Sequence, residues 1–326
     1  MNQKFIDFMR KFYGKKLAVA VSGGIDSIAL LYWLTEIGAD IVCLHVNHKL
    51  RDAAENEEKY VRDTCKKLNV PFCAFYWSGD KPETGVEAAA RTARYKMMTD
   101  FCHENGIEYL LTAHQADDQI ETFLMNLGRG SGVFGLSSMQ PIVERDGIKI
   151  VRPLLNVFRA ELQEYLDTRG IKYFTDEMNL DTRYTRVRIR QNRHLLHDKL
   201  GISDNRILLA IENLNRVRCT IANDVDKLVA DVMGNGFAMF RDSFLFDLGA
   251  DIRLKFIGTL IQKIGGDEYQ PRLNSLRLAL EKLNNDCKFT LGHCTIRRLG
   301  ERILIVREGA KTTFRIRHGK NKQIKK

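Results

Sequence analysis

Short apolar runs alternate, in the first half of the chain, with segments whose apolar residues recur every three or four positions. The apolar runs lie at 17–21, 41–46, 71–77, 108–113 and 148–151, and each has the length of a buried β-strand. The periodic segments between the runs predict helices. Strands that are apolar throughout and alternate with helices are typical of a parallel sheet covered on both faces. We therefore predict an α/β fold built on a doubly wound parallel sheet.

The pattern changes near residue 200. A long helix is predicted from Ile207 to Val232, and helical periodicity returns over 251–284. Short β-like runs then lie at 289–291, 294–298 and 302–306. We therefore expect two domains, one at 1–205 and one at 206–326, which is smaller, mainly helical and ends in short strands and a basic tail.

The composition indicates a soluble protein with a polyanionic partner. The chain has 326 residues, of which 44% are hydrophobic and 28% charged, and its net charge is +10. Its apolar runs are far shorter than a membrane span, and its first residues lack the apolar core of a signal peptide, so we expect a cytoplasmic protein that binds no membrane. Seven scattered cysteines without a C-x-x-C pair favour reduced thiols over a disulfide, zinc or iron–sulfur framework.

A glycine-rich turn, Ser22-Gly-Gly-Ile-Asp-Ser27, joins the first apolar run to a helical segment. Such a turn directs backbone N–H groups toward an anion, and the following helix adds partial positive charge. We expect phosphate to bind at Ser22, Gly23, Gly24, Ile25, Asp26 and Ser27. Asp26 is suited to hold the cation that accompanies the phosphate. The stretch is neither a Walker A loop nor the dinucleotide fingerprint, and an ordinary turn would not explain two hydroxyls and a carboxylate in six residues.

Two more polar clusters follow predicted strands, at 45–51 and 114–121. Because the carboxyl ends of parallel strands meet at one edge of a sheet, we expect both clusters to converge with the glycine-rich turn on one crevice. His45, Asn47 and His48 are candidates to contact a base or ribose. A histidine satisfied by the backbone is the alternative.

Within the second cluster, Asp118 and Glu121 share a helix face and are suited to hold an ammonium group or a metal ion. An acidic first turn that complements the helix dipole is the alternative. The adjacent Gly128–Gly132 stretch is predicted to be a mobile loop near the crevice, or a plain connector.

Basic residues gather in two places. Arg91 and Arg94 lie with Tyr95 on one stripe of a predicted helix, where either arginine could reach a phosphate or form an exposed charged face. The densest basic stretch comprises Arg183, Arg186, Arg188, Arg190 and Arg193. We expect this second stretch to contact a phosphate backbone.

These motifs carry a family resemblance. Ser22–Ser27 resembles the pyrophosphate loop of the N-type ATP pyrophosphatases, which cleave ATP to AMP and pyrophosphate. Further motifs follow in order: His45-Val-Asn-His48-x-Leu-Arg51, Arg91-x-x-Arg94-Tyr95, Thr112-Ala-His114-x-x-Asp117-Asp118-x-x-Glu121-Thr122, Arg129-Gly-Ser-Gly132, Arg152-Pro-Leu-Leu155 and Tyr184-x-Arg186-x-x-x-Arg190. Together they resemble the tRNA(Ile)-lysidine synthetase family over roughly residues 15–193.

The resemblance implies a two-step reaction that uses ATP and Mg²⁺. The C2 oxygen of the wobble cytidine, in the CAU anticodon of a minor isoleucine tRNA, attacks the α-phosphorus of ATP and releases pyrophosphate. The ε-amine of free L-lysine then displaces AMP and gives lysidine. A PP-loop tRNA thiolase and a small-molecule adenylating synthetase are the alternatives. The sequence is compatible with a homodimer.

The resemblance also assigns roles to residues. It makes Asp26, Arg94, Asp118 and Arg186 catalytic, with Asp26 holding Mg²⁺. It assigns ATP binding to Ser22, Gly23, Gly24, Ile25, Asp26, Ser27, His45, Asn47 and His114. It assigns lysine binding to Asp118 and Glu121, and tRNA binding to Arg183, Arg188, Arg190, Arg193 and the domain at 206–326.

Overall fold

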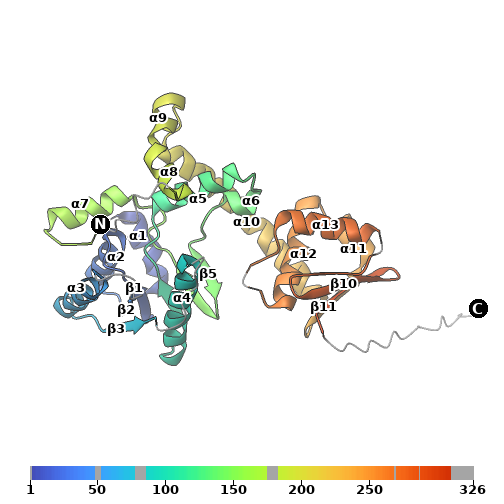
Figure 1. The fold of residues 1–326 in the computed structure, drawn as a ribbon, viewed down its shortest axis with the longest axis horizontal. Coiled ribbons are helices and arrows are strands. Elements are labelled where there is room, and N and C mark those ends of the chain that lie inside the picture. Colours follow the sequence, from blue (N-terminus) through green and yellow to red (C-terminus); the bar gives the residue numbers. More distant parts are fainter. Residues whose placement is uncertain are drawn as a thin grey trace, which may run out of the picture. The chain divides into compact units, whose positions relative to one another are not determined.

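The computed structural model describes residues 2–47, 53–77, 86–174, 183–267, 269–285 and 287–309. His48 and the basic tail from Lys311 fall outside this set. Contacts divide the chain into two units, Met1–Arg218 and Cys219–Lys326, whereas the sequence predicted a boundary after residue 205. The predicted long helix is present as α10 (Asp204–Val232) and contributes to both units (Figure 1). Within the described residues, no helix is long and apolar enough to cross a bilayer.

The N-terminal unit is built on a six-stranded sheet in the order β3-β2-β1-β4-β6-β5. Its strands are β1 (Leu17–Ala20), β2 (Ile41–Asn47), β3 (Phe72–Tyr76), β4 (Tyr109–Leu111), β5 (Ile142–Arg145) and β6 (Ile148–Val151). Only the edge strand β5 is antiparallel to its neighbour, so the predicted parallel, doubly wound sheet is confirmed. The sequence did not predict β5, because it contributes only two apolar residues and both are partly or fully exposed.

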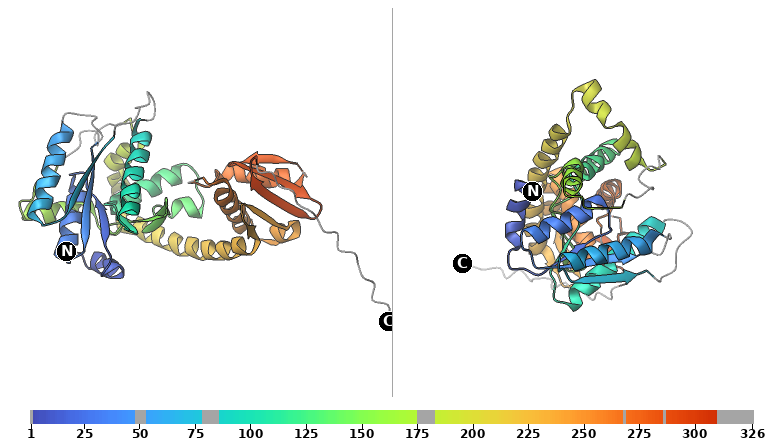
Figure 2. Two further views of the ribbon diagram at one scale, coloured as in Figure 1. Left: turned by 90° about the horizontal axis from the view of Figure 1, so that it is seen from below. Right: turned by 90° about the vertical axis from the view of Figure 1, so that its left-hand side faces the viewer.

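Helices cover both faces of this sheet (Figure 2). The helices of this unit before α10 are α1 (Gln3–Met9), a 3₁₀ turn η1 (Arg10–Phe12), α2 (Ile25–Glu36), α3 (Ala53–Lys67), α4 (Val86–Glu104), α5 (Ala116–Gly128), α6 (Val133–Leu136), α7 (Arg159–Thr168), α8 (Thr185–Asn192) and α9 (His194–Leu200). One core joins α1, α2, α3 and α7 to the face of the sheet that carries Val19. A second core joins α4, through Met98, to the face that carries Ala18 and Leu44. Complete burial of a side chain such as Met98 stabilises the fold by about 1.5–3 kcal/mol relative to its exposure.

The position of β1 determines where a ligand can bind. Val19 in β1 pairs with Cys43 of β2 on one side and with Leu111 of β4 on the other. The chain passes outward from β1 through β2 to β3, and it resumes on the opposite side at β4. Connections therefore leave the carboxyl ends of β1 and β4 in opposite directions. In sheets of this kind, ligands bind in the crevice that this divergence opens.

The C-terminal unit contains a five-stranded antiparallel sheet in the order β7-β8-β11-β10-β9. Its elements after α10 are β7 (Met233–Gly234), β8 (Phe237–Arg241), α11 (Asp242–Asp247), α12 (Ala250–Gly265), α13 (Leu273–Asn284), β9 (Phe289–Leu291), β10 (Cys294–Leu299) and β11 (Arg302–Arg307). Phe256 and Leu260 of α12 are fully buried with Ile296 and Ile305 of the sheet. The predicted helices and terminal strands are confirmed, and β7, β8 and α11 are additional.

Candidate functional site

A cavity of about 520 Å³ opens at the carboxyl edge of the parallel sheet, where β1, β2 and β4 end. Its lining includes these residues that the sequence singled out: Ser22, Gly24, Ile25, Asp26, Ser27, His45, Arg94, His114, Asp118, Arg186 and Arg190. The predicted convergence of three clusters on one crevice is therefore confirmed. Six other predicted residues are absent from the lining: Gly23, Asn47, Glu121, Arg183, Arg188 and Arg193.

Two serines tie the glycine-rich loop to the start of α2. The Ser27 hydroxyl donates to the carbonyl of Gly24 at 3.0 Å, and the Ser22 N–H donates to the Ser27 hydroxyl at 3.2 Å. Gly23 has a φ of +95°, a backbone conformation that favours glycine. α2 begins at Ile25, within this loop, and its first turn lines the cavity, which places the unpaired N–H groups of the helix where an anion site requires them.

Asp26 lies in that first turn with its side chain mostly buried. Its Oδ1 atom is buried without a hydrogen-bond partner among the described residues. Burial raises the pKa of Asp26 to about 6, against the effect of the positive charge of Arg159. An unpaired carboxylate oxygen fits Mg²⁺, which is usually bound by one or two carboxylates together with substrate phosphates. The described residues contain no cluster of three or more metal-ligating side chains, so substrate phosphates and water would supply the remaining ligands.

Arg159 is a cavity residue that the sequence interpretation missed. Its guanidinium Nη1 lies 3.6 Å from Oδ2 of Asp26. It is the first residue of α7, and its backbone N–H donates to Oδ2 of Asp117 at 2.9 Å. The available sequence signal was a basic residue at the start of the helix that follows a parallel strand.

The segment before residue 175 covers the glycine-rich loop. The N–H of Phe174 donates to the carbonyl of Gly23 at 3.0 Å, and the Phe174 ring packs edge-on against Tyr60 at 5.5 Å. The Tyr60 hydroxyl donates to the carbonyl of Lys172. These contacts attach residues 172–174 to both the loop and α3.

The residues at the end of β2 differ in their surroundings. His45 lines the cavity, and its Nδ1 lies 2.8 Å from the carbonyl oxygen of Val21, as the backbone-satisfied alternative expects. Burial lowers the pKa of His45, which favours the neutral ring. Asn47 is buried, and its amide donates to Oε2 of Glu58 at 3.1 Å and to the carbonyl of Ala54 at 3.4 Å. The contacts of Asn47 therefore fix α3 beside β2.

His114 marks the positively charged part of the cavity. Its Nδ1 lies 3.1 Å from the hydroxyl of Thr112. Burial, the largest cause, together with the charges of four arginines, lowers the pKa of His114 to about 3; in order of their effect the arginines are Arg152, Arg91, Arg186 and Arg94. A neutral imidazole surrounded by guanidinium groups is an environment suited to an anionic ligand.

Tyr95 supports this region from α4. The guanidinium carbons of Arg91, Arg94 and Arg145 lie 5.1, 5.8 and 4.4 Å from the centre of its buried ring. Cation–π contacts of this kind each contribute about 0.5–1 kcal/mol at exposed sites and more when desolvated. Arg94 lines the cavity from this support, as its assignment required.

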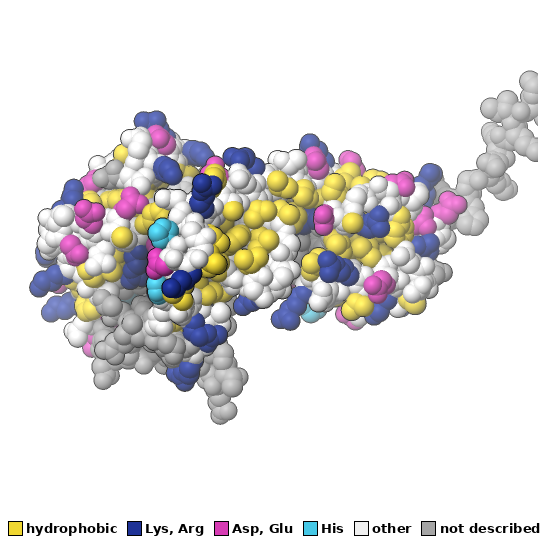
Figure 3. All heavy atoms as spheres, turned by 90° about the horizontal axis from the view of Figure 1, so that it is seen from above, with side chains coloured by type: hydrophobic (Ala, Val, Ile, Leu, Met, Phe, Trp, Pro, Cys, Tyr) yellow, Lys and Arg dark blue, Asp and Glu magenta, His cyan; other side chains and the backbone are white. Residues whose placement is uncertain are grey.

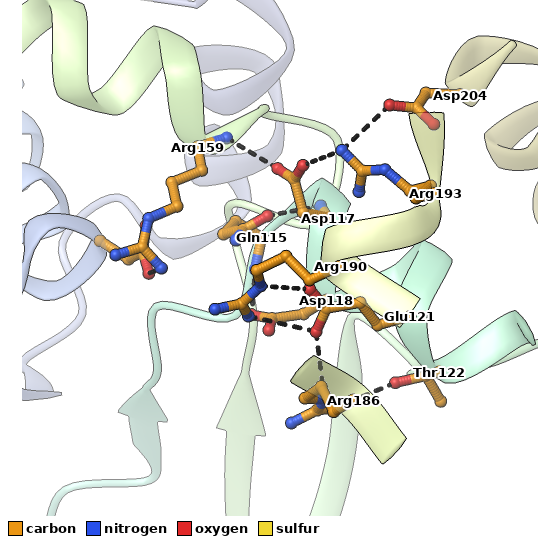
Figure 4. A network of polar contacts seen from close by, with 11 residues as sticks. Gln115, Asp117, Asp118, Glu121, Thr122, Arg159, Arg186, Arg190, Arg193 and Asp204 are labelled. Carbon is orange, nitrogen blue, oxygen red and sulfur yellow. Dashed lines mark hydrogen bonds and ion pairs between the residues drawn. The ribbon is translucent and has the colours of Figure 1, made fainter. Parts of the chain in front are cut away.

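The carboxylates of α5 meet the arginines of α8 (Figure 4). Glu121 is fully buried, and Arg190 contacts it at two points, with Nε 2.7 Å from Oε1 and Nη2 3.2 Å from Oε2. Nε of Arg186 lies 3.2 Å from Oε2 of the same carboxylate. Burial raises the pKa of Glu121, and the hydrogen bond from Arg190 opposes that effect. Asp118 lines the cavity while its Oδ2 accepts from the N–H of Gln115 at 3.2 Å.

Asp117 joins three further elements (Figure 4). Its Oδ1 lies 2.5 Å from Nη2 of Arg193, and the same Nη2 lies 3.1 Å from Oδ2 of Asp204 at the start of α10. Its Oδ2 accepts from the backbone of Arg159. Arg190 and Arg193, both predicted to bind tRNA, therefore hold internal carboxylates, whereas Arg183 and Arg188 are exposed.

The Gly128–Gly132 stretch forms a compact turn outside the cavity lining. The N–H of Ser131 donates to the carbonyl of Asn126 at 3.0 Å, and the Asn126 amide donates to the carbonyl of Gly135 at 2.7 Å. A Cβ on Gly135 would lie 2.6 Å from the Cβ of Ser131, so this position requires glycine. Its contacts agree with the connector rather than with the mobile loop.

Comparisons with known proteins agree on one family. The chain matches the model of the PP-loop domain over residues 1–195. A tRNA(Ile)-lysidine synthase from Wolbachia sp. subsp. Brugia malayi (strain TRS) is 35% identical over 94% of this chain and 74% of its own length. The tRNA(Ile)-lysidine synthase from Ruegeria pomeroyi (strain ATCC 700808 / DSM 15171 / DSS-3) is 34% identical over 90% of this chain and 71% of its own length.

A solved structure has a similar fold. The U34-tRNA thiolase NcsA from Methanococcus maripaludis, determined with its [4Fe-4S] cluster, superposes with a TM-score of 0.54 and 17% identity. The superposition covers 65% of this chain and 77% of that structure. At this identity the similarity concerns the fold alone.

Proposed function

Because the chain belongs to the tRNA(Ile)-lysidine synthase family of PP-loop proteins, we propose that it uses ATP to join free L-lysine to C2 of the wobble cytidine in a minor isoleucine tRNA. One observation carries the proposal. A single cavity is lined by the glycine-rich loop with Asp26 and by Asp118 together with Arg186 and Arg190. Adenylation needs the first group, and capture of an amino acid needs the second.

The loop would hold the triphosphate of ATP. Backbone N–H groups at the start of α2 and the hydroxyl of Ser22 are donors for the β- and γ-phosphates. Asp26 would hold Mg²⁺, which neutralises charge on the departing pyrophosphate. Arg94 would approach the α-phosphate beside the neutral His114, where negative charge develops during attack.

The other side of the cavity would hold lysine. Asp118 lines the cavity and is suited to bind the α-ammonium group, and Arg186 is suited to bind the α-carboxylate. With both α-groups held, the free ε-amine is positioned to attack C2 and displace AMP, and this orientation raises the rate of the attack. We also propose that Glu121 contributes to lysine binding, although its buried carboxylate is already paired with Arg190 and Arg186.

The tRNA would enter with its anticodon loop first. Bases of a single-stranded loop can be turned into a cavity without unpairing a duplex. Arg183, just before α8, and Arg188, on α8, are exposed, and other residues of this helix line the cavity. Basic side chains are spread over both units on the face drawn in Figure 3, in keeping with a net charge of +10 and phosphate contacts outside the anticodon.

The alternative of a tRNA thiolase draws no support from the cavity. All seven cysteines are among the described residues, and none of them lines it. Four of the seven are buried.

The proposal is tested by ATP-dependent incorporation of labelled lysine into a transcript of isoleucine tRNA with a CAU anticodon. We expect label in the tRNA, with AMP and pyrophosphate formed in equal amounts. Asp26→Ala should abolish all three products, and a transcript with a CAU anticodon from methionine tRNA provides a substrate control. ATP turnover on another substrate without incorporation of lysine would contradict the proposal.

A further inference from the structure

Arg159 contributes a positive charge to the cavity, and within the described part of the chain its side chain has only a loose partner. Its side chain is 29% exposed, and its Nη1 lies 3.6 Å from Oδ2 of Asp26, which is longer than a hydrogen bond. The other arginines of this network are engaged more closely. Arg190 makes a two-point contact with Glu121, and Arg193 contacts two carboxylates. Among these three, Arg159 retains the most donor capacity for a ligand.

The backbone of Arg159 is held firmly although its side chain is not. Its N–H donates to Asp117, and α7 packs against α2 in one core that includes Leu162, Leu166 and Trp33. The Cα of Arg159 is therefore fixed relative to the glycine-rich loop at the start of α2. Its long side chain is free to exchange partners without movement of the helix.

Arg159 and Arg94 reach the cavity from opposite faces of the sheet. The helix that carries Arg159, α7, belongs to the core on one face, and α4, which carries Arg94, belongs to the core on the other. Arg159 lies beside Asp26, and Arg94 contributes to the positive surroundings of His114. The two cations therefore serve different parts of a ligand that extends across the carboxyl edge of the sheet.

The loop itself supplies no basic side chain, because residues 22–27 contain two serines, two glycines, an isoleucine and an aspartate. A triphosphate carries several negative charges, and one Mg²⁺ ion neutralises only two of them. A guanidinium group can bind phosphate oxygens at two points. Among the described residues, Arg159 is the cavity arginine that forms an ion pair with this loop, through Asp26.

We propose that Arg159 binds the β- and γ-phosphates of ATP and then the pyrophosphate product, and that it leaves Asp26 when they bind. The identity of the ligand rests on the proposed cleavage of ATP to AMP and pyrophosphate. Asp26 exchanges the guanidinium for Mg²⁺, and Arg159 exchanges the carboxylate for phosphate oxygens. In the nucleotide-free protein, each side chain keeps the other partly neutralised.

Calorimetric binding of ATP, inorganic pyrophosphate and AMP, with Mg²⁺ and without tRNA or lysine, tests the assignment. Arg159→Met should weaken binding of pyrophosphate and of ATP at least tenfold and change binding of AMP less than twofold. Arg159→Lys, which keeps the charge but loses the two-point contact, should give an intermediate loss. Unchanged pyrophosphate binding in Arg159→Met, or an equal loss for AMP, would overturn the assignment.

Arg169→Met is the matched control. Arg169 follows the last residue of the same helix and lies 3.8 Å from Glu36, and it does not line the cavity. The Arg169→Met variant should bind ATP, pyrophosphate and AMP with the affinities of the wild type. Should Arg159→Met fail to fold, Arg159→Lys decides, because wild-type affinity for pyrophosphate in that variant would contradict the two-point contact.

The exchange of partners has its own test in Mg²⁺-free buffer. Asp26→Asn should tighten the binding of pyrophosphate, because it removes a negative charge and releases Arg159. The gain should be at least threefold smaller when Arg159→Met is already present. Equal gains in both backgrounds would show that the two side chains do not compete. Because these measurements involve no tRNA or lysine, they can succeed where lysine incorporation fails, and the reverse.

Discussion

Arg190 and Glu121 form a two-point contact around a carboxylate that is completely buried. The two residues are separated by 69 positions and join α8 to α5. Arg186, one turn before Arg190, contacts the same carboxylate. Glu121 therefore determines the position of two guanidinium groups that line the cavity, although it does not line the cavity itself.

Replacement of Arg190 by alanine should destabilise the N-terminal unit. Glu121 would keep only its contact with the half-exposed Arg186, and a buried carboxylate that loses its main partner costs roughly 3 kcal/mol. Both tryptophans, Trp33 and Trp77, lie in this unit, so denaturant unfolding followed by tryptophan fluorescence reports on it.

Arg188→Ala is the control for that measurement. Arg188 lies two residues away on the same helix, is exposed, and donates to the carbonyl of Arg183 and the hydroxyl of Thr185. Its loss should change the free energy of unfolding by less than about 0.5 kcal/mol. Equal effects of the two substitutions would contradict a stabilising role for the buried contact.

Asp118→Asn and Glu121→Gln should separate direct from indirect effects on lysine. Asp118 lines the cavity, so its substitution should raise the KM for lysine at least tenfold, with little change in the KM for ATP or in stability. Glu121→Gln should raise the KM for lysine and also lower the free energy of unfolding, because both arginines lose their shared anchor. Steady-state kinetics and denaturant unfolding of the two variants check this. A tenfold rise in KM without loss of stability in Glu121→Gln would instead favour direct contact with lysine.

The basic residues near α8 should divide into two classes in tRNA binding. Arg183 and Arg188 are exposed, whereas Arg193 is held by Asp117 and Asp204. Neutralisation of one phosphate-binding side chain lowers the slope of log K against log salt concentration by about one unit. Arg188→Gln should show that change. Arg193→Gln should leave the slope unchanged and lower stability instead, and identical slopes for the two variants would contradict the division.

Much of the site could be predicted because strand ends are local features. The apolar runs predicted the strands of the sheet. Because the carboxyl ends of parallel strands meet at one edge, Ser22, His45 and His114 could be placed together without any information on long-range contacts. The pairing of Glu121 was not predictable in this way. Its spacing from Asp118 shows that the two share a helix face, but its partner Arg190 lies 69 residues further along the chain.

Arg159 was missed for the same physical reason. Its place in the cavity follows from the packing of α7 on α2, which depends on contacts such as that between the rings of Trp33 and Tyr165. No local pattern encodes that contact. In the C-terminal unit, β7 was missed because it has only two residues. β8 contains four consecutive apolar residues, at 237–240, and what no local pattern shows is its pairing with the distant β11.

His114 should make the stability of the N-terminal unit depend on pH. Burial and neighbouring arginines lower its pKa from 6.5 to about 3, so the unfolded chain binds a proton below pH 6.5 that the folded chain does not bind. The free energy of unfolding should therefore fall as the pH decreases through this window, by about 1–2 kcal/mol between pH 7 and pH 5 from this residue.

His114→Gln should remove that contribution, and tryptophan-detected unfolding of both proteins at pH 7, 6 and 5 measures it. Asp26, whose pKa is raised to about 6, acts in the opposite direction, because its folded form binds a proton that its unfolded form releases above pH 3.8. This opposing effect is common to both proteins and cancels in their difference. As the pH decreases, the free energy of unfolding of the wild type should therefore fall relative to that of His114→Gln. Parallel profiles of stability against pH would show that His114 titrates normally in the folded protein. The surroundings of His114 would then not be the buried, positively charged pocket on which the placement of the α-phosphate depends.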